Sequence, residues 1–198
     1  MVLCIGLTCA LVFMCGNALN YSTPKLLMQV SGWSLGTVGF AAALANIPTV
    51  LLMLLVCWHS DHRRAPHLHI AAMIALTLVG ALGMAWAFNA PAGLAIIAML
   101  AAYCLFNAAG TVVGPLTMPA ASAQLHPATR AVAFAAINTI AQVGNFLGPV
   151  LWGFAATKTG SFQFALSAIP IILLVPLGLI LLMRRNRPRP VALAAAVS

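Results

Sequence analysis

The stretch from Ala65 to Thr129 contains no Asp, Glu, Lys or Arg. As a helix it is long enough to cross a hydrocarbon core of about 30 Å more than once, whereas a soluble domain needs charged side chains to cover its surface. The whole chain has the same character, because 63% of its residues are hydrophobic and a single acid stands against nine Lys and Arg. Lipid must therefore be the solvent for most side chains, which predicts a polytopic membrane protein.

Six apolar runs of roughly 20 residues divide the chain into candidate spans. The runs are continuous and lack the alternation of a barrel wall, so each is expected to be a helix. The predicted spans are Val2–Asn20, Leu35–Trp58, Leu68–Phe88, Gly93–Val113, Ala131–Ala156 and Phe162–Met183. The sequence thus predicts an all-α membrane protein, with one six-helix domain over 1–183 and a basic cytoplasmic tail over 184–198.

Positive charge is concentrated on alternate connections between these spans. Two arginines follow the second span, one precedes the fifth and four follow the sixth, whereas the other connections hold only Lys25 and Lys158. Because positively charged loops stay preferentially in the cytoplasm, we expect both termini on the cytoplasmic side of a bacterial inner membrane. The basic residues are scattered over loops rather than gathered on one folded face, so the net charge of +8 does not indicate nucleic-acid binding.

The cysteines and histidines follow no recognised metal or redox pattern. All five cysteines fall inside predicted spans without a C-x-x-C spacing, and the four histidines around Asp61 match no standard zinc site. No metal, cofactor or enzymatic activity is predicted from them. The first span begins at Met1 without a basic leader region, so we do not expect a signal peptide. We expect instead that a further segment precedes this span.

Amide side chains distinguish four of the spans from the other two. Asn or Gln occurs in the first, second, fourth and fifth spans, where an amide needs a protein or water partner. The third and sixth spans are almost free of polar side chains and could face lipid all round. Two polar spans and one apolar span therefore occur twice in succession, which suggests two inverted three-helix repeats at about 1–88 and 93–183.

Three stretches of the chain resemble one family. Trp58-His59-Ser60-Asp61-His62-Arg63-Arg64 resembles the loop between the eighth and ninth helices of the anion:cation symporter branch of the major facilitator superfamily. Residues 135–140 running into 144–149 are similar to that family's eleventh helix, and residues 159–162 to the entry to its twelfth. The branch includes phthalate, tartrate, hydroxyphenylacetate and sugar-acid permeases. The resemblance covers only the C-terminal six of the family's twelve helices, so it implies a half-transporter that needs an N-terminal half.

One stripe of the fifth span carries three amides. Asn138, Gln142 and Asn145 are spaced i, i+4 and i+7, so they share a helix face and could bond a carboxylate or hydroxyl of a substrate. The alternative is interhelical hydrogen bonding, worth about 1 kcal/mol per amide. Pro149 is predicted to bend this helix.

Beside that stripe the same span carries a pair of glycines four residues apart. Gly144 and Gly148 form a G-x-x-x-G pattern, which is predicted to allow another helix to approach closely.

Further substrate-binding candidates lie on the first and fourth spans. Tyr103, Asn107 and Thr111 repeat at i and i+4 on the helix that is equivalent, in the resembled family, to a cavity-lining tenth helix, and their stripe could face the substrate path. Matching Pro24 to the family's proline places Asn17 and Tyr21 near residues that are expected to face the cavity. For all five, the alternative is a polar group that is simply satisfied inside a bundle.

The only acid of the chain lies beside two arginines at the cytoplasmic end of a span. Asp61, with Arg63 or Arg64, is expected to gate the pathway by contacting a helix of the absent half and so stabilising the outward-open state. The alternative is a helix-end charge that serves membrane insertion only.

These features predict half of a secondary active transporter for small organic anions such as tartrate, aromatic acids or sugar acids. We expect proton coupling, with the charged binding and coupling residues on the N-terminal half, because no charged residue lies within a predicted span. The alternatives are a non-transporting truncated remnant, or a helper that binds another membrane protein. A six-helix channel is a third possibility, although no filter motif or ring of charges is visible.

Overall fold

The structure, a computed structural model, describes residues 1–63, 65–122, 124–160 and 162–185. Within these residues six helical segments are long and apolar enough to cross a membrane, and α2 with α3 makes up one of them. The elements are α1 (Val2–Ser31), α2 (Leu35–Leu44), α3 (Asn46–Arg63), α4 (Pro66–Ala87), α5 (Ala92–Ser122), the 3-10 turn η1 (Pro127–Thr129), α6 (Arg130–Thr159) and α7 (Phe162–Arg185). The prediction of an all-α protein with six spans is confirmed.

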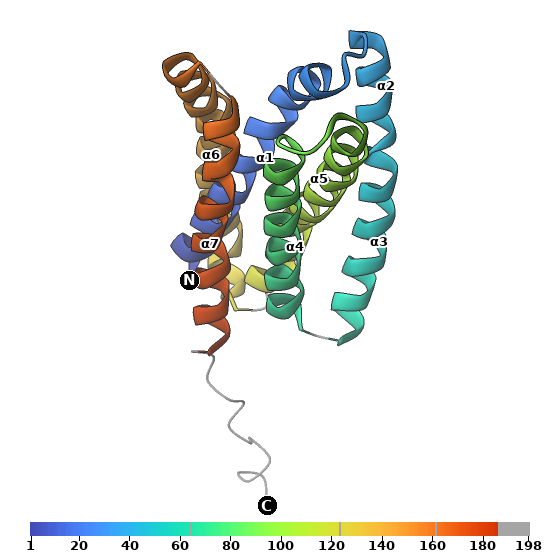
Figure 1. Cartoon of the computed structure of the whole chain (residues 1–198). Helices are drawn as coiled ribbons and strands as arrows, with labels where there is room; N and C mark the ends of the chain where they lie inside the picture. The colour runs from blue at the N-terminus through green and yellow to red at the C-terminus, as the bar shows by residue number, and fades with distance from the viewer. Residues whose placement is uncertain (64, 123, 161, 186–198) are drawn as a thin grey trace, which may run out of the picture.

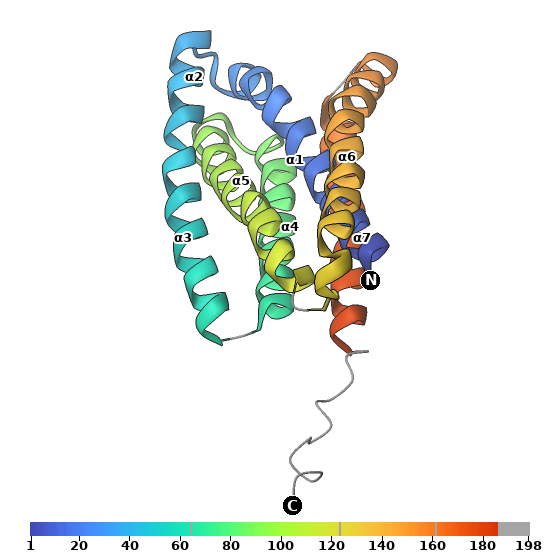
Figure 2. The same ribbon diagram turned by 180° about the vertical axis from the view of Figure 1, so that it is seen from behind.

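The helices stand side by side in one bundle (Figure 1). α1 packs along α6 and α4 packs along α5, while α3 leans on α5 and α7 lies against both α4 and α1. The view from behind places α3 at one edge of the bundle and α6 with α7 at the other (Figure 2). The chain enters α1 and leaves α7 at the same end, as six crossings require.

Two long helices end in glycines with left-handed backbone angles. Gly32 follows α1 with a φ of 68°, and Gly160 follows α6 with a φ of 66°, a conformation that costs other residues strain. α1 continues to Ser31, well past its predicted end at Asn20, and the added part contains Lys25, which lies outside the predicted span. A helix of 30 residues is about 45 Å long, which leaves Lys25 near the membrane surface rather than at its centre.

The second predicted span is divided in two. The helix breaks at Ala45, and α3 then runs on to Arg63 instead of ending at Trp58. Asp61 consequently lies in the last turn of α3 and not in a connecting loop, while Arg64 lies outside the described residues. Polar residues near the end of an apolar run can extend a helix into the membrane interface, which composition alone does not reveal.

The fourth and sixth spans contain prolines inside their helices. α5 continues beyond its predicted end at Val113 and includes Pro115 and Pro119, and α7 includes Pro170 and Pro176. Membrane helices tolerate such prolines because neighbouring helices and local adjustments satisfy the freed carbonyl groups.

The two spans that are almost free of polar side chains are not the most exposed ones. Half of the residues in the most apolar window of α4 are buried, and a third of those in α7, whereas only 11% of the corresponding residues are buried in the segment Leu35–Arg63. The expectation that the third and sixth spans face lipid all round is therefore wrong. An apolar side chain packs equally well against protein or lipid, so the absence of polar groups does not identify a lipid-facing helix.

The main core lies where α1, α4, α5 and α7 meet. Leu19, Ile74, Phe106 and Leu173 are each at most 1% exposed and belong to one contiguous cluster. Buried hydroxyl groups inside the bundle bond to their own helix, as the Thr77 hydroxyl does by donating to the Met73 carbonyl over 2.8 Å. The bundle thereby buries hydroxyls without leaving them unsatisfied.

Candidate functional site

A cavity of about 260 Å³ lies between α1, α5 and α6, about midway along each helix. Four asparagines reach it from three helices: Asn17 and Asn20 from α1, Asn107 from α5 and Asn145 from α6. Phe106 and another phenylalanine add aromatic surface. Among the described residues, the lining contains no Asp, Glu, Lys or Arg. The cavity therefore combines amide groups with a largely apolar wall and carries no charge.

The α1 side of the cavity is tied to α6 by a chain of amides. Asn17 donates from Nδ2 to Oδ1 of Asn145 over 2.6 Å, and Asn145 donates from its own Nδ2 to Oε1 of Gln142 over 2.8 Å. The second bond runs along α6, and the first crosses between helices. These bonds fix the orientation of Asn145, which lines the cavity.

Two glycines bring α1 and α6 close enough for that bond. A Cβ atom added at Gly144 would overlap the carbonyl oxygen of Ala10, and one added at Gly148 would overlap that of Met14. These contacts are with backbone atoms, which cannot rotate away. The G-x-x-x-G segment of α6 therefore lies directly against the α1 backbone, the geometry that such spacing permits.

On the α5 side of the cavity, one asparagine bonds to residues next to the break between α2 and α3. Asn107, only 6% exposed, donates from Nδ2 to Oδ1 of Asn46 over 3.1 Å and to Oγ1 of Thr49 over 3.2 Å. Asn46 and Thr49 in turn donate to the carbonyls of Ala42 and Ala45 on either side of the break. One buried amide thus fastens the interrupted helix to α5.

The seven predicted substrate-binding residues separate into groups. Asn17, Asn107 and Asn145 line the cavity. Gln142 contacts it only through Asn145, and Tyr103 is buried behind it, where its hydroxyl donates to Oδ1 of Asn20 over 3.2 Å.

The remaining two predicted residues do not line the cavity. Asn138 and Tyr21 are exposed, and the exposed fraction of Tyr21 is 75%. Helical spacing relates residues on one helix, but it does not specify which part of a stripe faces the neighbouring helices.

Two further polar residues line the cavity. Thr111 follows Asn107 by four positions, on the stripe predicted to face the substrate path. Asn20 was absent from the predicted substrate-binding set, and its i+3 spacing from Asn17 is the signal that identifies it. The phenylalanine rings of the lining carry no such signal, because Phe occurs throughout the apolar helices.

The predicted gating residues lie at the other end of α3, remote from the cavity. Asp61 and Arg63 are exposed in its last turn, and the ring of Trp58 stacks on that of His62 with centroids 6.1 Å apart. The adjacent histidine ring, His59, meets His69 of α4 edge to face at 5.2 Å. The gate candidates thus occupy the end of the bundle that carries both termini.

Comparison with known proteins identifies the family. The profile of the Major Facilitator Superfamily matches residues 5–197. A putative tartrate transporter of Agrobacterium vitis is 29% identical over 168 residues, which is 85% of this chain and 36% of the relative. A quinolone resistance transporter of Acinetobacter baumannii is 26% identical over 82% of this chain and 36% of its own length. The chain spans about a third of the length of these relatives. With a family match over nearly its whole length, the chain belongs to the Major Facilitator Superfamily, a family of transporters rather than enzymes.

Proposed function

We propose that this chain is one six-helix half of a secondary active transporter for small organic anions, such as tartrate, aromatic acids or sugar acids. The observation that carries the proposal is the neutral cavity lined by four asparagines from three helices. An amide can donate to a carboxylate oxygen and accept from a hydroxyl, so such a wall can orient a hydroxylated acid. The similarity to a putative tartrate transporter supports this substrate class.

The cavity has no charge of its own, so the proposal assigns charge recognition elsewhere. A proton-coupled anion transporter needs a cation near the anion and a group that titrates in the pathway. We place both on an N-terminal six-helix half, which is a partner of this chain in the assembled transporter. This division leaves the present half to orient the substrate through hydrogen bonds.

Two exposed apolar faces are available to a second half, as they are to lipid. The exposed fractions of Leu54, Leu55 and Trp58 on α3, and of Phe146 and Phe154 on α6, lie between 61% and 71%. α3 and α6 lie at opposite edges of the bundle (Figure 2), and α6 lines the cavity with α1 and α5. We propose that a partner seated on both edges covers these faces and encloses the cavity.

The charges at the two ends of the bundle support an orientation. Arg63, Arg130 and Arg184 lie at the end that carries both termini, and Lys25 and Lys158 belong to the opposite ends of their helices. We infer from the positive-inside rule that both termini and the basic tail face the cytoplasm of a bacterial inner membrane. Asp61 and Arg63 would then gate the cytoplasmic mouth, together with Arg64.

The helix pairings support two three-helix repeats at about 1–88 and 93–183. In the two repeats α1 corresponds to α5, the α2–α3 segment to α6, and α4 to α7. The pairing of α1 with α6 then corresponds to that of α5 with α3, and the pairing of α1 with α7 to that of α5 with α4. All four pairings occur in the bundle. We propose that the repeats have inverted topology, as in other secondary transporters.

The exposed faces also favour one alternative, a non-transporting remnant or helper that binds another membrane protein. The discriminating experiment places the chain in proteoliposomes, alone and together with the N-terminal half of the Agrobacterium vitis relative. Under an imposed proton gradient, uptake of tartrate, an aromatic acid or a sugar acid is expected only in pairs that co-purify. Co-purification without uptake would favour the helper function, and accumulation by the chain alone would overturn the need for a partner.

A further inference from the structure

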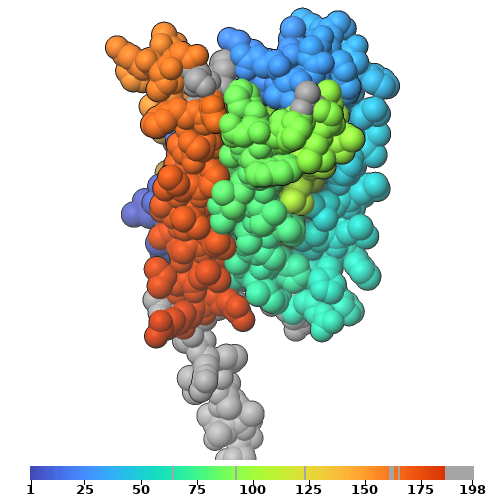
Figure 3. Space-filling view, viewed as in Figure 1, coloured from blue at the N-terminus to red at the C-terminus, as the bar shows by residue number. Residues whose placement is uncertain are grey.

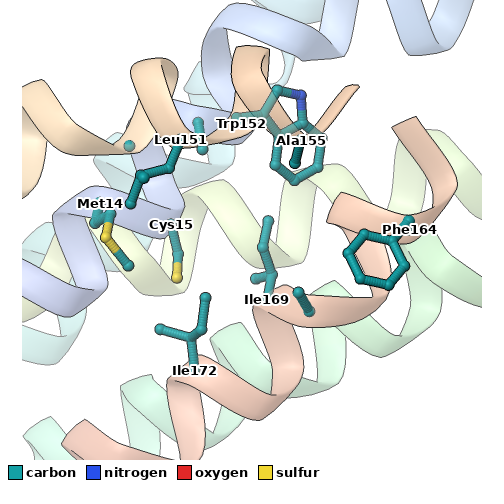
Figure 4. A pocket seen from close by; sticks show the side chains of 11 residues that line it. Met14, Cys15, Leu151, Trp152, Ala155, Phe164, Ile169 and Ile172 are labelled. Carbon is teal, nitrogen blue, oxygen red and sulfur yellow. The ribbon is translucent and has the colours of Figure 1, made fainter. Parts of the chain in front are cut away.

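A wedge opens between α1 and α6 toward the end of the bundle where α6 ends and α7 begins. The space-filling view shows this end notched between the orange end of α6 and the blue end of α1 (Figure 3). At the base of the wedge an apolar pocket of about 160 Å³ is closed by α7 (Figure 4). Its walls include Met14, Cys15, Trp152, Ala155, Ile169 and Ile172.

A polar cavity of about 490 Å³ lies nearer to the end of the wedge. It is lined by Lys25 and Gln29 of α1, by Thr157 of α6 and by Phe88 next to the end of α4. Lys25 follows Ala18, which lines the apolar pocket, by seven residues. Two helical turns therefore separate them on one face of α1, a rise of about 10 Å.

A hydrogen bond joins segments next to the two cavities. Gln163 at the start of α7 donates from Nε2 to Oδ1 of Asn89 at the end of α4 over 2.7 Å. Asn89 follows Phe88 of the polar cavity, and Gln163 precedes Phe164 of the apolar pocket. The bond therefore holds the start of α7 against the end of α4.

We propose that this wedge binds one anionic phospholipid, with an acyl chain in the apolar pocket and the headgroup phosphate at Lys25. The arrangement matches an amphipathic ligand, because an ammonium group with an amide beside it stands two helical turns from an apolar pocket. The Thr157 hydroxyl donates to the Gly153 carbonyl and is not assigned to the phosphate. Phospholipid surrounds a membrane-spanning bundle, and a lysine near the membrane surface attracts anionic headgroups. The site faces α7 and is separate from the asparagine cavity.

The chain provides two matched controls. Lys158, the other lysine at this end, lies 5.7 Å from the ring centroid of Phe154 and does not line the polar cavity. A second apolar groove of about 310 Å³, which includes Leu7 and Val143, lies between α1 and α6 without a charged residue in its described lining. It offers hydrocarbon contact without a headgroup partner.

The test uses the full chain in nanodiscs with Trp152 as its only tryptophan, the other three being replaced by phenylalanine. Phosphatidylglycerol or phosphatidylcholine with brominated acyl chains serves as the quencher. Half-maximal quenching of Trp152 is expected at a lower mole fraction of brominated phosphatidylglycerol than of brominated phosphatidylcholine. Lys25→Gln should reduce this preference about five-fold, the change that corresponds to about 1 kcal/mol per cation near an anionic surface. Lys25→Arg and Lys158→Gln should keep it.

Equal quenching by the two lipids in the unmutated wedge would overturn the proposal. So would an unchanged preference in Lys25→Gln, or an equal loss in Lys158→Gln. If Lys25→Gln does not elute as a folded protein, Ala155→Leu decides, because it narrows the apolar pocket without touching the cation. It should weaken quenching of Trp152 by phosphatidylglycerol, whereas Val143→Phe in the control groove should not, and equal effects of the two would also contradict the site.

Discussion

Asn17 on α1 and Asn145 on α6 share a hydrogen bond of 2.6 Å that crosses the wall of the cavity. A double-mutant cycle with Asn17→Ala and Asn145→Ala should therefore give a coupling energy of about 0.6 kcal/mol, the average for such bonds between membrane helices. Equilibrium unfolding in mixed detergent and SDS micelles measures it. Pairing Asn17→Ala with Thr139→Ala, an exposed position on α6, is the control and should be additive. Additivity of the Asn17 and Asn145 variants would contradict the bond.

Close packing of α1 on α6 makes a second prediction. Gly144→Ala should destabilise the bundle by about 1–3 kcal/mol, because the new methyl group overlaps the backbone of Ala10. Gly153→Ala is the matched control on the same helix, since nothing lies within 4 Å of its added Cβ. Alanine should raise stability there, as it favours helix over glycine by about 0.5–1 kcal/mol. The midpoints of thermal unfolding in detergent would rank the two, and equal midpoints would refute the packing argument.

The six helices and their approximate places could be predicted from the sequence, because long apolar runs have one stable solution in lipid. The ends could not. α1 stops only where Gly32 adopts a left-handed conformation, and the residue after the break at Ala45 accepts a hydrogen bond from the Asn107 amide of another helix. Such tertiary partners do not appear in the local pattern.

Part of the polar lining could be anticipated from the sequence. Asn17, Asn107 and Asn145 were selected because an amide in an apolar helix needs a partner, and all three line the cavity. Asn138 and Tyr21 were also selected and are exposed in this half, so a substrate-binding role for each of these residues stays a prediction. Burial of a polar side chain depends on which helices become neighbours, and one sequence without its fold does not determine those neighbours.

The Asn107 amide should control the α2–α3 segment. Asn107→Ala removes the donor to Asn46 and Thr49, which should cost about 1 kcal/mol and speed amide hydrogen exchange around Ala45. The expected pattern is faster exchange near the break with unchanged exchange in α6. Thr111→Val, one helical turn further along α5, is the control variant. Uniformly faster exchange throughout the bundle would indicate general destabilisation instead.

Asp61 should matter for gating rather than for the stability of this half. Its carboxylate is exposed at the end of α3, so Asp61→Asn should change the unfolding free energy by less than about 0.5 kcal/mol. Asp61 lies close enough to Cys57 for its charge to affect the reactivity of that thiol directly, so the comparison is between the chain alone and a co-purified pair with an N-terminal half. Asp61→Asn should alter the rate at which a membrane-impermeant maleimide labels Cys57 more in the pair than in the chain alone. Lys158→Gln, at the opposite end of the bundle, should leave the rate unchanged in both. The same change in rate with and without the N-terminal half would eliminate the gate.

The most direct test of the central claim asks whether substrate occupies the asparagine cavity. Thr111 lines the cavity and Thr139 does not, so each is replaced by cysteine in a chain that lacks its five native cysteines and is paired with an N-terminal half. Tartrate, phthalate or gluconate should slow maleimide labelling of Thr111→Cys without affecting Thr139→Cys. Labelling of Thr111→Cys at the same rate with and without each acid would contradict the account.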